Sequence, residues 1–245
     1  MSPNKGEYLI RHSSVEPIFE NRYDAGRKLA EKLKEYADKE AAVLGIPNGG
    51  VAVALGVALA VGADFDLIIS RKIPLPLSPE GGFGSVTDDG TIILSEDIVK
   101  QAGLSQQQID YQVSQVRSNI RHRSLLYHND RPPLSVTGRT VIIVDDGLAS
   151  GYTMRAAIES LRYRKPGKII AAVPVGPAQV VKDIQKVADR VVTCAIGNET
   201  VFYVSDYYRY WQDITDSEVL NCLKEWRLRK SGGRIQLPER KRQTD

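Results

Sequence analysis

The sequence contains few of the residues that build disulfide scaffolds or metal sites, since its 245 residues include only two cysteines and three histidines. Cys194 and Cys222 do not have the spacing of zinc ligands, so we expect two ordinary thiols in a reducing compartment. No apolar run approaches the roughly 18 residues that cross a bilayer, and the first residues contain no apolar signal core. These absences exclude a disulfide-rich or membrane-spanning class and predict a cytoplasmic protein without a membrane partner.

Two nucleotide-binding signatures are also missing. The sequence has no Gly-Lys-Ser/Thr ending of a P-loop, and no Gly-x-Gly-x-x-Gly follows the first expected strand. The composition is otherwise that of a globular protein, with 42% hydrophobic and 26% charged residues. The length is sufficient for one α/β domain with a complete core.

The net charge of +3 is unevenly distributed, because basic residues are concentrated between Arg227 and Arg242. Gly232, Gly233 and Pro238 interrupt this stretch, and it has almost no apolar residues. We interpret residues 231–245 as a basic, disordered tail rather than a nucleic-acid-binding segment, so nucleic acid is not an expected partner.

Short apolar strands alternate with helical patterns along most of the chain. Ala25, Leu29 and Leu33 recur at four-residue steps, which predicts an amphipathic helix over residues 21–36. Residues 51–61 are apolar throughout and predict a buried crossover helix. Strands are predicted at residues 41–45, 65–70, 140–144, 168–174 and 190–196. This alternation predicts an α/β fold with a central, mostly parallel sheet flanked by helices.

The alternation is interrupted between residues 71 and 90, which contain three prolines and four glycines in a pattern that predicts a long, flexible loop. Residues 91–94 follow as a possible short strand. Ser105 with Gln108 has capping-box spacing and predicts a helix that runs to about residue 126. Thr215 with Glu218 repeats this spacing and predicts a last helix over residues 216–229.

The segment from Val141 to Met154 carries the strongest chemical pattern. An apolar strand ends in Asp145 and Asp146, and a turn of small residues then opens a helix. Backbone N–H groups and the helix dipole converge at such a turn, which favours a phosphate. Two carboxylates at the strand end can accept hydrogen bonds from two neighbouring hydroxyls, as on a ribose. Strand ends are where open α/β sheets bind ligands.

Asp145-Asp-Gly-Leu-Ala-Ser-Gly-Tyr-Thr153 resembles the motif of type I phosphoribosyltransferases that binds phosphoribosyl pyrophosphate (PRPP). The resemblance implies that Asp145 and Asp146 hold the ribose hydroxyls, act in catalysis and hold Mg²⁺ as the cofactor. It implies that the ribose 5′-phosphate lies on the residues that follow the acid pair, which are Gly147, Leu148, Ala149, Ser150, Gly151, Tyr152 and Thr153.

A second glycine turn, Gly45-Ile-Pro-Asn-Gly-Gly-Val51, leaves the first strand and is similar to the family's pyrophosphate loop. The resemblance assigns pyrophosphate binding to Pro47, Asn48, Gly49 and Gly50, although such a turn is also common packing between a strand and a buried helix. Arg71 and Lys72 resemble the family's Arg-Lys segment and would neutralise the leaving group as catalytic residues; the alternative is a solvated basic pair. The loop over residues 74–90 would then be a mobile lid.

Aromatic residues are dense between Glu199 and Trp211, directly after the last core strand. The family resemblance places a hood over the nucleobase here. Phe202 or Tyr203 could stack on a base and Asp206 could read its edge. Packing of this aromatic cluster under the last helix is an equal alternative.

The whole pattern predicts one phosphoribosyltransferase domain over residues 1–230. The predicted core covers residues 21–196, the hood the N-terminal segment and residues 197–215, and the last helix residues 216–229. The predicted activity transfers the phosphoribosyl group of PRPP to a nitrogenous base, with a purine favoured. The alternative is a PRPP-sensing regulatory protein without catalysis. The family resemblance also implies a homodimer.

Overall fold

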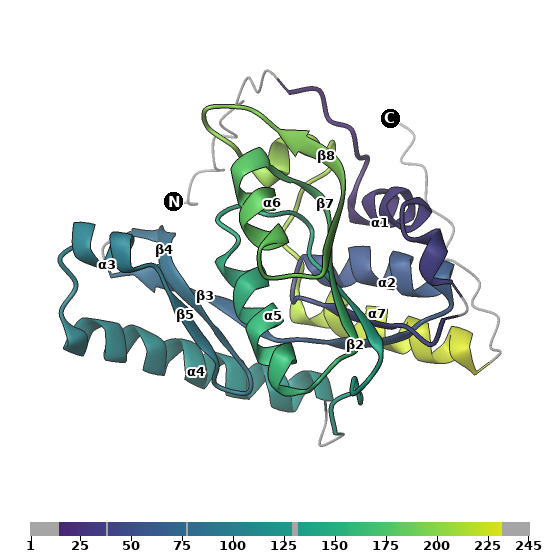
Figure 1. The fold of residues 1–245 in the computed structure, drawn as a ribbon, viewed down its shortest axis with the longest axis horizontal. Helices are drawn as coiled ribbons and strands as arrows, with labels where there is room; N and C mark the ends of the chain where they lie inside the picture. The colour runs from purple at the N-terminus through teal and green to yellow at the C-terminus, as the bar shows by residue number, and fades with distance from the viewer. Residues whose placement is uncertain (1–14, 38, 77, 129–131, 232–245) are drawn as a thin grey trace, which may run out of the picture.

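A parallel sheet of five strands forms the centre of the computed structural model, which describes residues 15–37, 39–76, 78–128 and 132–231. Its strands lie in the order β2-β1-β6-β7-β8 (Figure 1). Their bounds are Asp64–Leu67 for β2, Ala42–Gly45 for β1, Thr140–Val144 for β6, Lys168–Pro177 for β7 and Arg190–Gly197 for β8. The predicted α/β fold with a parallel sheet is therefore confirmed. The predicted strand over residues 65–70 is too long, since β2 ends at Leu67.

Helices cover both faces of this sheet (Figure 1). On one face lie α1, α2 and α7, and on the other lie α5 and α6. Their bounds are Arg22–Glu31 for α1, Gly50–Val61 for α2, Tyr152–Tyr163 for α5, Ala178–Gln185 for α6 and Asp216–Lys230 for α7. Short 3₁₀ turns η1 and η2 span Lys34–Tyr36 and Val204–Tyr207.

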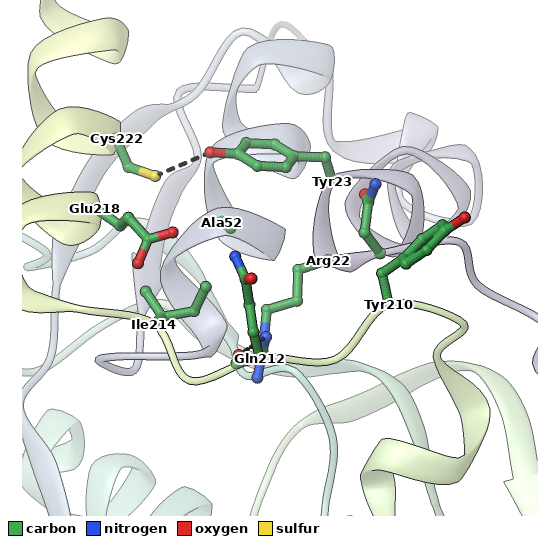
Figure 2. A pocket seen from close by; sticks show the side chains of 9 residues that line it. Arg22, Tyr23, Ala52, Tyr210, Gln212, Ile214, Glu218 and Cys222 are labelled. Atoms are coloured by element: carbon green, nitrogen blue, oxygen red, sulfur yellow. Dashed lines mark hydrogen bonds between the residues drawn. The ribbon is translucent and has the colours of Figure 1, made fainter. Parts of the chain in front are cut away.

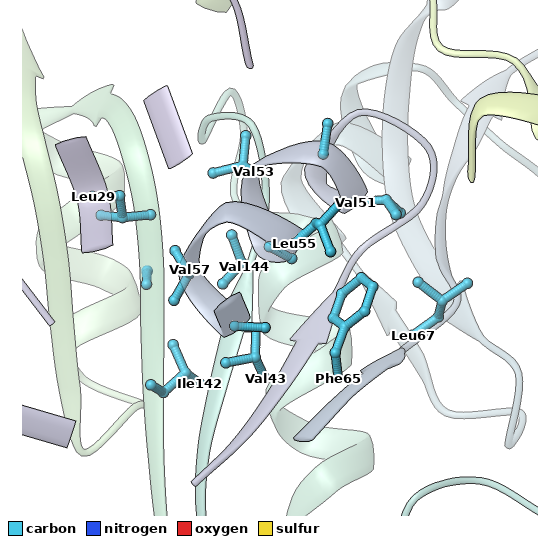
Figure 3. Packing of buried hydrophobic residues seen from close by; sticks show 14 of the residues in the cluster. Leu29, Val43, Val51, Val53, Leu55, Val57, Phe65, Leu67, Ile142 and Val144 are labelled. Atoms are coloured by element: carbon cyan, nitrogen blue, oxygen red, sulfur yellow. The ribbon is translucent and has the colours of Figure 1, made fainter. Parts of the chain in front are cut away.

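The central strands β1, β6 and β7 are mostly apolar because their successive side chains enter different cores. The edge strand β2 instead alternates aspartate with buried apolar residues. In β1, Val43 packs in the core under α2, while Ala42 and Leu44 belong to the core under α5. Ile142 and Val144 of β6 join Val43 beneath α2 (Figure 3). A strand covered on both faces has no solvent side, which explains the continuous runs.

A second, antiparallel sheet of three strands extends from the core together with α3 and α4, and we call these elements the arm (Figure 1). The arm elements are β3 (Ser70–Leu75), β4 (Ser78–Thr87), β5 (Ile92–Leu94), α3 (Glu96–Gln101) and α4 (Gln106–His128). The prediction of a long loop over residues 71–90 is wrong, because most of this segment pairs as β3 and β4.

Glycine in β4 reflects close packing between strands. A Cβ on Gly84 would collide with the carbonyl oxygen of Ile93 on β5. Glycine is therefore required by the neighbouring backbone, although it reads as a loop signal in the sequence. Pro74 and Leu75 lie at register shifts of the β3–β4 pair, where a strand tolerates proline.

Both predicted capping boxes are confirmed. The backbone N–H of Gln108 donates to Ser105 Oγ at 3.3 Å, and Gln108 Oε1 accepts from the Ser105 N–H at 2.9 Å. Thr215 and Glu218 form the same reciprocal pair at the start of α7. The predicted disordered tail falls almost wholly outside the described residues. Among the helices that the structure describes, none is long and apolar enough to cross a bilayer.

Strand register brings the two predicted ligand loops together. Gly45 of β1 pairs with Val144 of β6, and both strands run in the same direction. The turns that follow them therefore leave the same edge of the sheet side by side. Gly45 also pairs with Leu67, so the chain leading from β2 into β3 leaves at this edge as well.

Candidate active site

A cavity of about 510 Å³ opens at this edge, which is the size of a small-molecule site. The predicted ligand residues that line it come from three segments far apart in the sequence: the turn after β1, the turn after β6, and the start of β3. Of the residues predicted for ligand binding, the cavity brings together Pro47, Asn48, Gly49, Arg71, Lys72, Asp145, Asp146 and Thr153.

The two aspartates lie on the cavity wall and differ in their surroundings. Asp145 Oδ1 accepts the backbone N–H of Asp146 at 2.8 Å. Burial, and then the neighbouring charge of Asp146, raise the pKa of Asp145 well above its usual range. Ionisation of both carboxyl groups is therefore costly unless hydroxyl donors or a cation stabilise the negative charge.

Arg22 of α1 is the partner of Asp146, and sequence reasoning missed it. Its Nε donates to Asp146 Oδ2 at 2.8 Å, and its side chain is only 7% exposed. Nη1 donates to the carbonyl of Gln212 at 2.8 Å, and the guanidinium lies 3.8 Å from the ring centroid of Trp211. One signal was available, because a cation in the first turn of a helix opposes the helix dipole and calls for another partner.

Tyr208 makes a second link to the acid pair. Its hydroxyl donates to the backbone carbonyl of Asp146 at 2.6 Å. Its ring lies 5.2 Å from that of Phe19 and 5.1 Å from that of Trp211. Segments from both ends of the chain thus meet above the strand edge that carries Asp146.

The turn after the acid pair presents uncommitted backbone donors. Gly151 adopts φ +78°, a left-handed conformation that glycine accepts, and α5 begins at the next residue. Within the described part of the chain, no backbone N–H from Ala149 to Thr153 donates a hydrogen bond to protein. Free amides at a helix N-terminus form a site for an anion such as a phosphate.

The turn after β1 lies directly against the acid pair. A Cβ on Gly49 would collide with the Asp146 carboxylate, and one on Gly50 would lie 2.7 Å from the Asp145 Cα. Only glycine permits this approach. The two turns therefore form one surface, with backbone on one side and carboxylates on the other.

Positive charge enters the cavity from β3. Arg71 is partly buried, and its pKa is lowered by burial and then by the nearby charge of Arg123. Within the described residues, the Arg71 side chain has no hydrogen bond or ion pair. Ser70 Oγ donates to the Thr153 carbonyl at 2.9 Å, which ties the start of β3 to the first turn of α5. Arg71 and Lys72 both line the cavity with the two turns, and their neutralisation of a pyrophosphate stays a prediction.

Arg123 of α4 is a further cavity residue that sequence reasoning missed. Its Nη1 donates to Asn48 Oδ1 at 2.5 Å, and its Nη2 lies 3.5 Å from Asp216 Oδ1. The sequence shows only an arginine among several charged residues of a long helix. Nothing local distinguishes it, because its position depends on how α4 packs beside β3.

The three residues predicted for base binding do not line this cavity. Phe202 packs on Tyr207 with ring centroids 5.4 Å apart, and Tyr203 is 43% exposed. The segment does reach the acid turn, because Val204 lies against Gly147. Base binding by Phe202, Tyr203 and Asp206 therefore stays a prediction.

The donor set at the acid pair fits Mg²⁺ only if a ligand completes it. Two adjacent carboxylates supply oxygen, which Mg²⁺ prefers, and this ion usually takes one or two carboxylates with substrate phosphates and water. In the residues that the structure describes, no group of three or more His, Cys, Asp or Glu side chains could hold a metal by itself. Asp145 and Asp146 are the side chains that would share it with a substrate.

A second pocket, of about 350 Å³, lies between α1, α2 and α7 (Figure 2). Tyr23 faces Cys222 across it, with the hydroxyl 3.8 Å from Sγ. Burial raises the pKa of Cys222 to about 11, so this thiol is protonated near neutral pH. It is an unreactive core thiol, in keeping with the expectation from the sequence.

Comparisons with known proteins agree with the geometry. A model of the phosphoribosyl transferase domain matches residues 14–208. Two provisionally named phosphoribosyl transferases from two strains of Mycobacterium tuberculosis are each 36% identical over 206 residues, covering 84% of this chain. The chain spans about half the length of these curated relatives, 46%. The crystal structure of TT1426 from Thermus thermophilus superposes with a TM-score of 0.70 at 32% identity, covering 85% of this chain and 98% of that one. The chain therefore belongs to the phosphoribosyltransferase family.

Proposed function

We propose that this protein transfers the 5-phosphoribosyl group of PRPP to a nitrogenous base, with Mg²⁺ and with release of pyrophosphate. The observation that carries the proposal is the division of one cavity into an acidic and a cationic side. Asp145 and Asp146 line the cavity at the end of β6, which we call its acidic side, and Arg71 and Lys72 line it from β3, which we call its cationic side. PRPP has the matching division, since its ribose presents hydroxyl donors and its pyrophosphate carries negative charge.

Each side of the cavity then has a defined task. The carboxylates of Asp145 and Asp146 accept hydrogen bonds from the ribose 2′- and 3′-hydroxyls, and the free amides from Ala149 to Thr153 bind the 5′-phosphate. This fixes the anomeric carbon relative to the pyrophosphate loop. Asp145 and Asp146 would hold Mg²⁺ together with the substrate, and the ion would supply neutralisation of the substrate's negative charge.

Bond cleavage at the anomeric carbon leaves positive charge on the ribose ring and adds negative charge to the departing pyrophosphate. The carboxylates of the acid pair stabilise the first, and Arg71 and Lys72 stabilise the second. The chain needs no side-chain nucleophile, because positioning and charge stabilisation supply the catalysis. The start of β3 lines the cavity, and in this proposal the β3–β4 hairpin closes over the bound substrate as a lid.

The acceptor is a purine-like base in this proposal, held by Phe202, Tyr203 and Asp206. Support comes from the contact of Val204 with Gly147, which places their segment beside the acid turn. The functional unit is proposed to be a homodimer, which light scattering on the purified protein would test.

The test is pyrophosphate release from PRPP and Mg²⁺, screened against purine and pyrimidine bases. Release that depends on a purine supports the full proposal, and release with a pyrimidine alone would replace the acceptor. Tight PRPP binding without release for any base would favour the regulatory PRPP sensor. Absence of PRPP binding would refute both.

A further inference from the structure

Two arginines from different elements share the cationic side of the cavity. Arg71 comes from β3 and Arg123 from α4. They lie close enough for the charge of Arg123 to lower the pKa of Arg71. The nearest carboxylate is that of Asp216, which is 3.5 Å from Arg123 Nη2. Asp213 also lines the cavity, but among the described residues it forms no ion pair with either arginine. Two guanidinium groups with one carboxylate in contact leave local positive charge that an anion would balance.

Arg123 is held in place by a network that leaves part of its guanidinium available. Asn48 Oδ1 accepts from Arg123, and Asn48 Nδ2 donates to the Ile214 carbonyl at 2.8 Å and to Asp216 Oδ1 at 3.0 Å. Tyr127, one turn along α4, donates to the same Asp216 oxygen at 2.5 Å. A guanidinium has five N–H donors, and the contacts with Asn48 and Asp216 do not use them all.

Asn48 itself has little capacity left for a ligand. Its two amide hydrogens and its oxygen all have protein partners, although its backbone belongs to the predicted pyrophosphate loop. The side chain therefore fixes the loop against α4 and α7. The cation in contact with this loop is Arg123, through its hydrogen bond to Asn48.

We propose that Arg123 binds the pyrophosphate of PRPP together with Arg71, so that the arm supplies part of the leaving-group site. This inference rests on the proposed function and adds a residue to it. The planar guanidinium suits two phosphate oxygens at once, and the cavity places Arg123 beside Asn48 and Gly49 of the loop. Among the described residues, no hydrogen bond or ion pair joins Arg123 to Asp145, Asp146 or the proposed 5′-phosphate turn, which spans residues 149–153.

The test uses two probes that occupy different sides of the cavity. Inorganic pyrophosphate with Mg²⁺ reports on the cationic side, and ribose 5-phosphate reports on the acid pair and the 5′-phosphate turn. Calorimetry compares the unmodified protein with Arg123→Gln, which keeps a donor for Asn48 but removes the charge. Loss of a charged hydrogen bond should weaken pyrophosphate binding about tenfold or more, with ribose 5-phosphate binding unchanged.

Arg121→Gln is the matched control, because Arg121 is an exposed arginine on the same helix. It should bind both probes as the unmodified protein does. Arg123→Lys keeps the charge without the planar fork and should weaken pyrophosphate binding by only a few-fold; it decides the matter if Arg123→Gln does not fold.

Three outcomes contradict the inference. Pyrophosphate binding that is unchanged in Arg123→Gln would exclude a contact. Equal weakening of both probes would show that Arg123 only supports the structure. An unmodified protein that binds neither probe would refute the proposed function itself, and this result is distinguishable because it appears before any substitution is made.

Discussion

The acidic and cationic sides of the cavity are built in different ways. The acidic side is one continuous segment, since Asp145, Asp146 and the 5′-phosphate turn follow β6 directly. The cationic side is assembled from β3, α4 and the turn after β1, and Arg71 and Arg123 are about 50 residues apart in the sequence. A continuous segment carries its geometry in its local pattern, whereas an assembled one depends on packing of the arm against the core.

The strongest test of this division removes the acidic side. Asp145→Asn combined with Asp146→Asn should weaken PRPP binding more than a hundredfold, because each lost charged hydrogen bond contributes about 1.5–3 kcal/mol. Pyrophosphate binding should remain. Calorimetry measures both, and circular dichroism checks the fold. Asp183→Asn, an exposed carboxylate on α6, is the control; retained PRPP affinity in the double variant would refute the assignment.

The second largest effect concerns Arg22, which pairs with Asp146 although it lies far from the acid pair in the sequence. Arg22→Gln leaves the Asp146 carboxylate without its buried partner and should lower the free energy of unfolding by about 3 kcal/mol. Urea denaturation measures this change. Arg27→Gln removes a 78% exposed arginine of the same helix and should change stability by less than about 0.5 kcal/mol. Equal effects would mean that the Arg22 ion pair has no special weight.

Arg71 should differ from Arg22, because we expect it to contribute to ligand binding but not to stability. Arg71→Gln removes a partly buried cation whose pKa is lowered by burial and then by the charge of Arg123. We expect pyrophosphate binding to weaken about tenfold, while the free energy of unfolding stays constant or rises slightly. Calorimetry and urea denaturation on the same preparation test both halves. A marked loss of stability would show that Arg71 is a structural residue.

The smallest predicted effect is the pH dependence of Asp145→Asn. The pKa of Asp145 is raised in the folded protein, so its ionisation costs more there than in the unfolded chain. Its contribution to stability is therefore fully present below the unfolded pKa of about 3.9 and is lost as pH rises through the folded pKa. Asparagine does not titrate. The variant should be more stable than the unmodified protein near pH 7, and this advantage should disappear toward about pH 4. A stability difference independent of pH would contradict the prediction.

The contrast between a continuous segment and an assembled one also explains which features could be predicted from the sequence. The approximate places of the five core strands, both capping boxes and the turn after the acid pair were predictable because propensity, periodicity and short-range hydrogen bonds determine them. Gly84 misled the prediction, since its role is to let the Ile93 carbonyl approach. Arg22 and Arg123 were not found, because each acquires its partner only when distant elements pack together.

The most direct test of the account is a calorimetric titration of the unmodified protein with PRPP and Mg²⁺, repeated with pyrophosphate or ribose 5-phosphate present. The account predicts one PRPP per chain and competition by each of the two partial ligands, because each occupies one side of the same cavity. PRPP that does not bind, or that binds without competition from either, would contradict the assignment of this cavity.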